Sequence, residues 1–126
     1  MDATMSLAAR AVQAAREVGA VQQEADSSIT LGSARGYLSA DDAGLDDLRA
    51  GLALATDIGA HFIALRAYVN ISDVLELLGR HQEAADAARE GMALADRVGL
   101  ARSLGAFLAG NLAESLLRLG RWKYVH

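Results

Sequence analysis

The chain repeats one of its own segments: Arg49-Ala50-Gly51-Leu52-Ala53-Leu54-Ala55 returns forty positions later as Arg89-Glu90-Gly91-Met92-Ala93-Leu94-Ala95. A second segment, Asn70-Ile71-Ser72-Asp73, returns forty-one positions later as Asn111-Leu112-Ala113-Glu114. A period near forty residues is typical of stacked supersecondary units in which each unit buries its apolar face only against its neighbours. The repeat therefore predicts a solenoid.

The composition favours helices. Of the 126 residues, 52% are hydrophobic, only 5% are aromatic and none is proline, which suits helices in close contact. Apolar residues recur at three- and four-residue steps in six segments, each of which we predict to be a helix. These segments are Leu7–Val18, Val21–Leu38, Leu45–Ile58, His61–Leu78, Glu83–Val98 and Ala101–Leu119.

Glycines mark the breaks between these helices. Gly19, Gly59 and Gly99 each follow a β-branched residue at a helix end, where a left-handed closing residue is needed. Gly79 and Gly120 stand at a second type of break, a short turn that folds one helix back on the one before. We therefore expect one helical-repeat domain over 1–126, built from antiparallel helix pairs. Its units are a partial unit at 1–19, two full units at 20–59 and 60–99, and a truncated unit at 100–126.

Small residues occupy the places where paired helices would touch. In one unit these are Ser72, Ala84 and Gly91, with His81 after the turn glycine Gly79 as a plug between the helices. The neighbouring copies supply Gly32, Gly44 and Gly51 on one side and Ala113, Gly120 and Trp122 on the other. This pattern resembles the tetratricopeptide repeat, although the period is forty rather than thirty-four residues and the closing proline is missing.

The resemblance implies a short right-handed tetratricopeptide-like solenoid. Long-helix variants of this kind look like the helical region of large bacterial LuxR-type ATP-binding transcriptional regulators. The segments that carry this likeness run from Ala67 to Leu75 with Leu78-Gly79-Arg80-His81, and from Gly105 to Glu114 with Leu119-Gly120-Arg121-Trp122. The phosphate loop and the DNA-reading helix of such a regulator are absent from this sequence.

Charge and composition argue against several classes of protein. The net charge is −4 and the chain has a single lysine, so we expect no direct binding to nucleic acid. It has no cysteine, no secretory signal and no apolar run of membrane-spanning length. We therefore expect a soluble cytoplasmic protein that does not contact a membrane.

No motif in the sequence supports catalysis or a cofactor. His61, His81 and His126 lie too far apart for a helical metal site, and no serine has a glycine-flanked elbow. We read the acidic cluster from Asp41 to Asp47 as a solvated helix start, in which Asp41 or Ser39 caps the helix. We expect that the protein is not an enzyme and that it binds no cofactor and no metal.

The first helices of tetratricopeptide units line the concave side of the stack. By this resemblance, a ligand in the groove would meet a set of polar residues on those helices, with asparagines gripping a peptide backbone. The alternative is that the asparagines satisfy buried groups between helices. The candidate groove residues are Tyr37, Arg66, Asn70, Asp73, Asn111, Glu114 and Arg118.

The sequence thus favours a non-enzymatic interaction scaffold, a piece of the regulatory repeat region of a LuxR-type regulator, with a protein, a peptide or a small inducer as its ligand. The alternative in the same class is a stand-alone adaptor that forms a homodimer through its uncapped terminal helices. An enzyme of unrecognised type is the third hypothesis, and it would need convergent titratable groups in a pocket.

Overall fold

The chain folds into helices alone. The computed structural model describes residues 3–18, 21–39 and 41–120, and within these ranges it contains six α-helices and no strand. This confirms the all-α class and the number of helices expected from the sequence. The helices are α1 (Ala3–Val18), α2 (Val21–Ser39), α3 (Asp42–Asp57), α4 (His61–Leu77), α5 (His81–Val98) and α6 (Leu104–Arg118).

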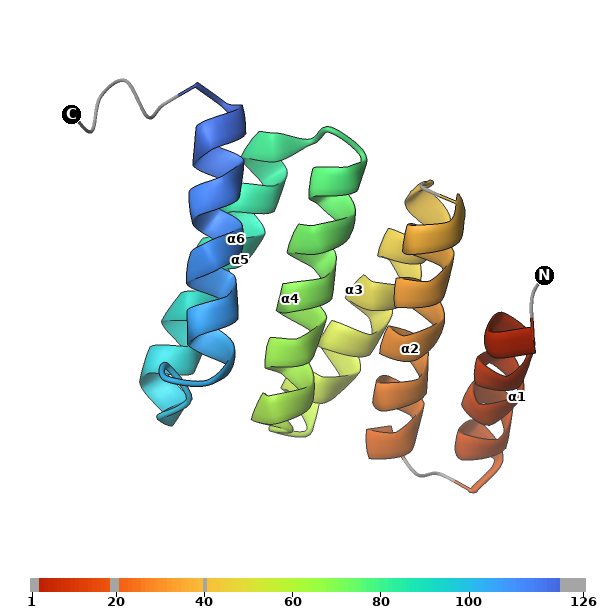
Figure 1. Cartoon of the computed structure of the whole chain (residues 1–126). Helices are drawn as coiled ribbons and strands as arrows, with labels where there is room; N and C mark the ends of the chain where they lie inside the picture. Colours follow the sequence, from red (N-terminus) through yellow and green to blue (C-terminus); the bar gives the residue numbers. More distant parts are fainter. Residues whose placement is uncertain (1–2, 19–20, 40, 121–126) are drawn as a thin grey trace.

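The helices are arranged as a row of antiparallel pairs. Each helix contacts the next one along the chain, and α4 also contacts both α2 and α6. Figure 1 shows α2, α4 and α6 side by side, with α3 and α5 behind them and α1 at the edge of the row next to α2. The C-terminal ends of α2, α4 and α6 therefore lie on the same side of the molecule.

The turns at Gly59, Gly79 and Gly99 share a glycine conformation and a backbone hydrogen bond. Gly59, Gly79 and Gly99 have φ of 69°, 75° and 79°, a left-handed conformation that side chains disfavour. In each turn the next residue donates its backbone N–H to the carbonyl five positions back, at 2.9 Å. The pairs are Ala60 with Ala55, Arg80 with Leu75 and Leu100 with Ala95. The two expected turn types thus share this hydrogen bond and a left-handed glycine.

Gly120 has φ of 73° and its N–H donates to the carbonyl of Leu117. The expectations for Gly19, Arg121, Trp122 and His126 lie outside the described residues.

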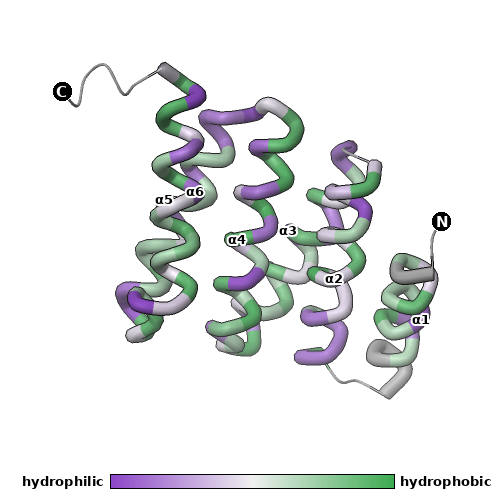
Figure 2. Tube along the Cα trace, viewed as in Figure 1, coloured by the Kyte–Doolittle hydropathy of each residue, from purple (hydrophilic) through white to green (hydrophobic). Residues whose placement is uncertain are grey.

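The core runs through the whole row of helices. The large side chains that are fully buried come from four helices, α2, α3, α4 and α6: Ile29, Leu45, Leu48, Leu65, Val74, Leu75 and Leu108. The buried positions of α3 recur forty residues later in α5, where Gly44, Leu45, Leu48, Gly51 and Ala55 correspond to Ala84, Ala85, Ala88, Gly91 and Ala95. In Figure 2, α4 alternates between hydrophobic and hydrophilic turns, as expected for a helix with one buried face.

Glycines allow α2 and α3 to touch through their backbones. A Cβ placed on Gly44 would lie 2.5 Å from the backbone N of Gly36, and a Cβ on Gly32 would lie 2.7 Å from the carbonyl oxygen of Gly44. Such distances do not occur between real side chains and backbone. The small residues expected at the helix contacts are therefore required there by geometry.

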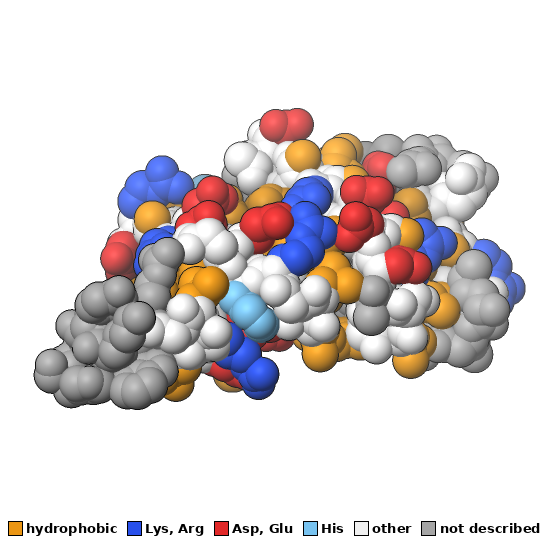
Figure 3. Space-filling model, turned by 90° about the horizontal axis from the view of Figure 1, so that it is seen from above, with side chains coloured by type: hydrophobic (Ala, Val, Ile, Leu, Met, Phe, Trp, Pro, Cys, Tyr) orange, Lys and Arg blue, Asp and Glu red, His pale blue; other side chains and the backbone are white. Residues whose placement is uncertain are grey.

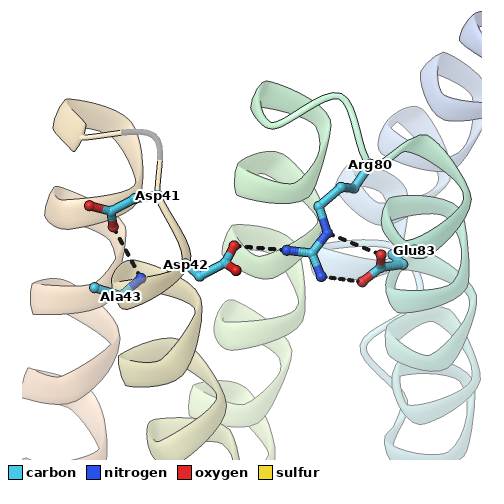
Figure 4. Close-up of polar contacts among 5 residues, drawn as sticks. All are labelled: Asp41, Asp42, Ala43, Arg80 and Glu83. Atoms are coloured by element: carbon cyan, nitrogen blue, oxygen red, sulfur yellow. Dashed lines mark hydrogen bonds and ion pairs between the residues drawn. The ribbon is translucent and has the colours of Figure 1, made fainter.

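Polar contacts fix where α3 and α5 begin. The Asp41 carboxylate accepts a hydrogen bond of 3.0 Å from the backbone N–H of Ala43, so Asp41 caps α3 as expected. Arg80 pairs with Asp42 at 2.9 Å and with Glu83 at 2.7 Å, and joins the start of α3 to the start of α5 (Figure 4). The sixth helix begins at Leu104 rather than Ala101, because residues 101–103 form a turn in which the Ser103 hydroxyl donates to the carbonyl of Leu100.

Candidate functional site

A polar cleft lies where α2, α4 and α6 run side by side. Its volume is about 450 Å³, and all its lining side chains come from these three helices. They are Tyr37 from α2, then Asp73, Glu76 and Leu77 from α4, and Asn111, Glu114 and Arg118 from α6. Five of the seven candidate groove residues expected from the sequence line this cleft.

Tyr37 and Asp73 connect α2 to α4 inside the cleft. The Tyr37 hydroxyl donates a hydrogen bond of 2.9 Å to the Asp73 carboxylate. Partial burial and the negative charge of Asp73 raise the pKa of Tyr37 above its ordinary value, so the phenol keeps its proton and remains a donor. Burial also raises the pKa of Asp73, against the hydrogen bonds from Tyr37 and Asn111, which lower it.

Asn111 connects α6 to α4 beside this pair. Its side-chain amide donates a hydrogen bond of 2.7 Å to the hydroxyl of Ser72, which is completely buried. The Ser72 hydroxyl in turn donates to the backbone carbonyl of Val69 at 2.9 Å. Asn111 therefore satisfies a buried group between helices, while its amide also lies next to Asp73 in the cleft.

Glu76 is a cleft residue that the sequence did not single out. Its side chain is only 13% exposed, and both carboxylate oxygens lie 3.0 Å from Nδ1 of His81, across the turn between α4 and α5. Nε of Arg118 lies 3.7 Å from Glu76, and the same guanidinium lies 3.3 Å from Glu114. His81, expected as a plug between the helices after the turn glycine, contacts Glu76 through its ring nitrogen.

Helical spacing within α4 offers one signal for this residue. Glu76 stands three positions after Asp73, one helical turn along the same face of α4. That spacing puts Glu76 beside Asp73, whereas its partners His81 and Arg118 come from the start of α5 and from α6.

Arg66 lies outside the cleft and holds α4 against α2. Its guanidinium pairs with Asp26 at 2.9 Å, and it donates to the Asp26 carbonyl at 3.1 Å and to the Thr30 hydroxyl at 3.3 Å. The Nε of Arg66 is buried without a hydrogen-bond partner among the described residues. Arg66 is therefore positioned as a link between two helices.

Asn70 also lies outside the cleft, although the sequence makes it equivalent to Asn111. The residue that Asn111 contacts is Ser72, and the equivalent of Ser72 in the preceding unit is Gly32, which has no hydroxyl. Among the described residues no hydrogen bond holds the Asn70 side chain. The two asparagines therefore have different environments despite the repeat.

The cleft combines negative charge with exposed apolar surface. Three carboxylates line it against the single arginine, and the side chains of Tyr37 and Leu77 are 49% and 57% exposed. Seen from the end of the helices where α4 turns into α5, acidic and basic side chains are interleaved, with hydrophobic side chains between them (Figure 3). The acidic and apolar lining of the cleft suits a ligand that carries both a cationic and an apolar group.

The titratable residues of the described ranges are not arranged as a metal site. Within residues 3–18, 21–39 and 41–120, no group of three or more His, Asp or Glu side chains is placed to hold a metal ion. His61 is exposed at the start of α4, as expected. The described helices include none that is both long enough and apolar enough to cross a bilayer.

Comparison of the chain with known proteins finds no matching family model, no matching curated protein and no matching solved structure. Inferences about function therefore depend on the geometry of the site and on the residue patterns of the chain.

Proposed function

We propose that this chain is a non-enzymatic helical-repeat scaffold that binds an extended peptide segment of a partner protein in the cleft between α2, α4 and α6. The observation that carries the proposal is the convergence of Tyr37, Asp73, Asn111, Glu114 and Arg118 on one open cleft from three helices. A cleft shared by three parallel helices is long enough to contact several residues of an extended ligand.

The charge of the cleft indicates the chemistry of the ligand. Asp73, Glu76 and Glu114 outnumber Arg118, and Arg118 is itself occupied by Glu76 and Glu114. An incoming arginine or lysine side chain would replace Arg118 on these carboxylates, while Leu77 and the ring of Tyr37 would contact an apolar neighbour. The preferred ligand is a peptide with basic and apolar residues.

The proposal includes a tetratricopeptide-like solenoid. It is supported by the contacts of α4 with both α2 and α6 and by the forty-residue recurrence of buried positions between α3 and α5. That the chain belongs to the regulatory region of a LuxR-type ATP-binding regulator is a further proposal, and it rests on the sequence resemblance alone.

The test is a fluorescence anisotropy titration with two short labelled peptides. One peptide alternates arginine with leucine, and the matched control alternates glutamate with leucine. The scaffold is expected to bind the arginine peptide and not the glutamate peptide. Equal binding of both peptides, or binding of neither, would contradict the proposal.

A pair of charge-matched variants locates the site. Glu114→Gln removes a carboxylate of the cleft and is expected to weaken binding of the arginine peptide at least about tenfold, because a charge-assisted hydrogen bond contributes about 1.5 to 3 kcal/mol. Asp46→Asn removes one carboxylate from the exposed surface of α3, outside the cleft, and should leave the affinity unchanged. Equal losses in the two variants would show a response to net charge rather than binding in the cleft.

A further inference from the structure

A second open groove lies at the other end of the row of helices, between α1 and α2. It has a volume of about 340 Å³ and is lined by Leu7, Ala8 and Ala11 of α1 and by Ser27 and Thr30 of α2. Leu7 is 61% exposed and Ala11 is also exposed. The groove is therefore apolar on the α1 side and carries small polar groups on the α2 side.

The corresponding place one unit later is filled. Ala8 and Ala11 correspond, forty positions on, to Leu48 and Gly51 of α3, and both of these are buried. They are covered by α2: a Cβ on Gly51 would lie 2.7 Å from the side chain of Ile29, and one on Gly32 would lie 2.8 Å from that of Leu48. A helix such as α2 thus occupies the groove of α3 and α4, whereas the groove of α1 and α2 is open.

The face of α2 that fills this place has a counterpart on α6. The residues of α2 on that face are Ala25, Ile29, Gly32 and Gly36, all of them buried. Eighty-one positions later on α6 stand Ala106, Gly110, Ala113 and Leu117, all of them exposed. A Cβ on Gly110 would meet nothing within 4 Å. This face of α6 is therefore small, largely apolar and uncovered by the described residues.

We infer that α6 of one copy docks in the groove between α1 and α2 of a second copy, so that the chain associates head to tail. The junction would repeat the contact that α2 makes with α3 inside one chain. Ala11 would then face Gly110, as Gly51 faces Ile29. Leu7 corresponds to Asp47 of α3, and Leu116 corresponds to Arg35 of α2. Since Asp47 and Arg35 form an ion pair of 2.8 Å, Leu7 would contact Leu116 at the junction. The exposed side chain of Leu7 would be buried at this apolar contact.

The two surfaces of this interface are different from each other. Such a heterologous contact does not stop at a dimer. A head-to-tail dimer still has one unoccupied groove and one unoccupied α6 face, so further copies can add to either end. Head-to-tail association therefore predicts a solution mass that keeps rising with concentration. A symmetrical interface between two α6 helices would instead stop at two copies.

The experiment uses light scattering on the full chain and two single variants. Ala11→Arg places a long charged side chain in the groove, and Gly110→Arg places one on the outer face of α6, where there is room for it. Both positions are exposed in a single copy, so each variant should keep the helicity of the wild type. The wild type is expected to grow with concentration, and each variant alone is expected to be a monomer.

Mixing the two variants gives the decisive result. Ala11→Arg retains an intact α6 face and Gly110→Arg retains an intact groove, so an equal mixture should form a one-to-one dimer and nothing larger. A wild type that stays monomeric at every soluble concentration would overturn the inference, as would loss of assembly in only one of the variants. A mixture that remains monomeric while the wild type assembles would overturn it as well.

Discussion

The side-chain amide of Asn111 on α6 donates a hydrogen bond of 2.7 Å to the hydroxyl of Ser72, which is completely buried on α4. This contact joins α6 to α4 beside the cleft. It gives Asn111 a structural role in addition to its place in the cleft lining. Asn70, its counterpart by sequence, has no such contact among the described residues.

Asn111→Ala is expected to lower the free energy of unfolding by about 1 kcal/mol, the usual contribution of one net hydrogen bond, because Ser72 would keep only its bond to Val69. Asn70→Ala is expected to change it by less than about 0.5 kcal/mol. Urea denaturation followed by circular dichroism measures both values. A larger loss for Asn70→Ala than for Asn111→Ala would show that the repeat, and not the observed contact, determines the role of these residues.

Gly44→Ala is expected to destabilise the chain by about 1 to 3 kcal/mol or more, because the added methyl group would lie 2.5 Å from the backbone N of Gly36 and force α2 and α3 apart. The matched control is Gly110→Ala, whose added methyl group meets open space. It should stabilise α6 by about 0.5 to 1 kcal/mol. Thermal unfolding at low protein concentration measures both, and similar shifts in the two variants would contradict the close contact of α2 with α3.

Asp73→Asn gives a prediction for pH. Burial raises the pKa of Asp73 in the folded chain above the ordinary value of 3.8, so ionisation of Asp73 destabilises the fold at neutral pH. This cost disappears as the pH falls through the raised pKa and below 3.8. The variant, which can still accept the Tyr37 hydrogen bond, is expected to have a higher melting temperature than the wild type at pH 7. The difference should shrink in acid, and a difference independent of pH would contradict this account.

Arg66→Gln tests whether Arg66 stabilises the contact of α2 with α4 without contributing to ligand binding. The ion pair with Asp26 is exposed, with 35% and 50% of the two side chains accessible, so its loss should cost less than about 1 kcal/mol of stability. Affinity for the arginine peptide should not change, since Arg66 does not line the cleft. A loss of affinity comparable to that of Glu114→Gln would show that Arg66 takes part in peptide binding.

The sequence predicted the helices well because their signals are local. Apolar periodicity marked all six helices, and Gly59, Gly79 and Gly99 marked their ends because only glycine closes a helix in the left-handed conformation without cost. The predicted starts of α1, α3, α5 and α6 differ from the observed ones by a few residues. The turns that had been expected to be of two types share one hydrogen bond, from the residue after the glycine to the carbonyl five positions back.

The cleft was only partly predictable because its contacts join residues far apart in sequence. The places of Tyr37, Asp73 and Asn111 in the sequence pattern indicated these residues, but the partners of Glu76 come from the start of α5 and from α6. Arg66 shares a helix with the cleft residues and still faces α2 through Asp26. Sequence equivalence identifies a position in the repeat, whereas the neighbouring unit determines what that position contacts.

The most direct test of the proposed function is to map where the arginine peptide binds. The chain would be labelled with ¹⁵N and titrated with the peptide while its amide chemical shifts are recorded. Binding in the cleft predicts the largest shifts at Tyr37, Asp73, Asn111 and Glu114. A second acidic groove, lined on the opposite helices by Arg49, Glu83, Asp86 and Glu90, provides the competing site. Shifts concentrated at these residues of α3 and α5 would contradict the proposal that the cleft between α2, α4 and α6 is the binding site.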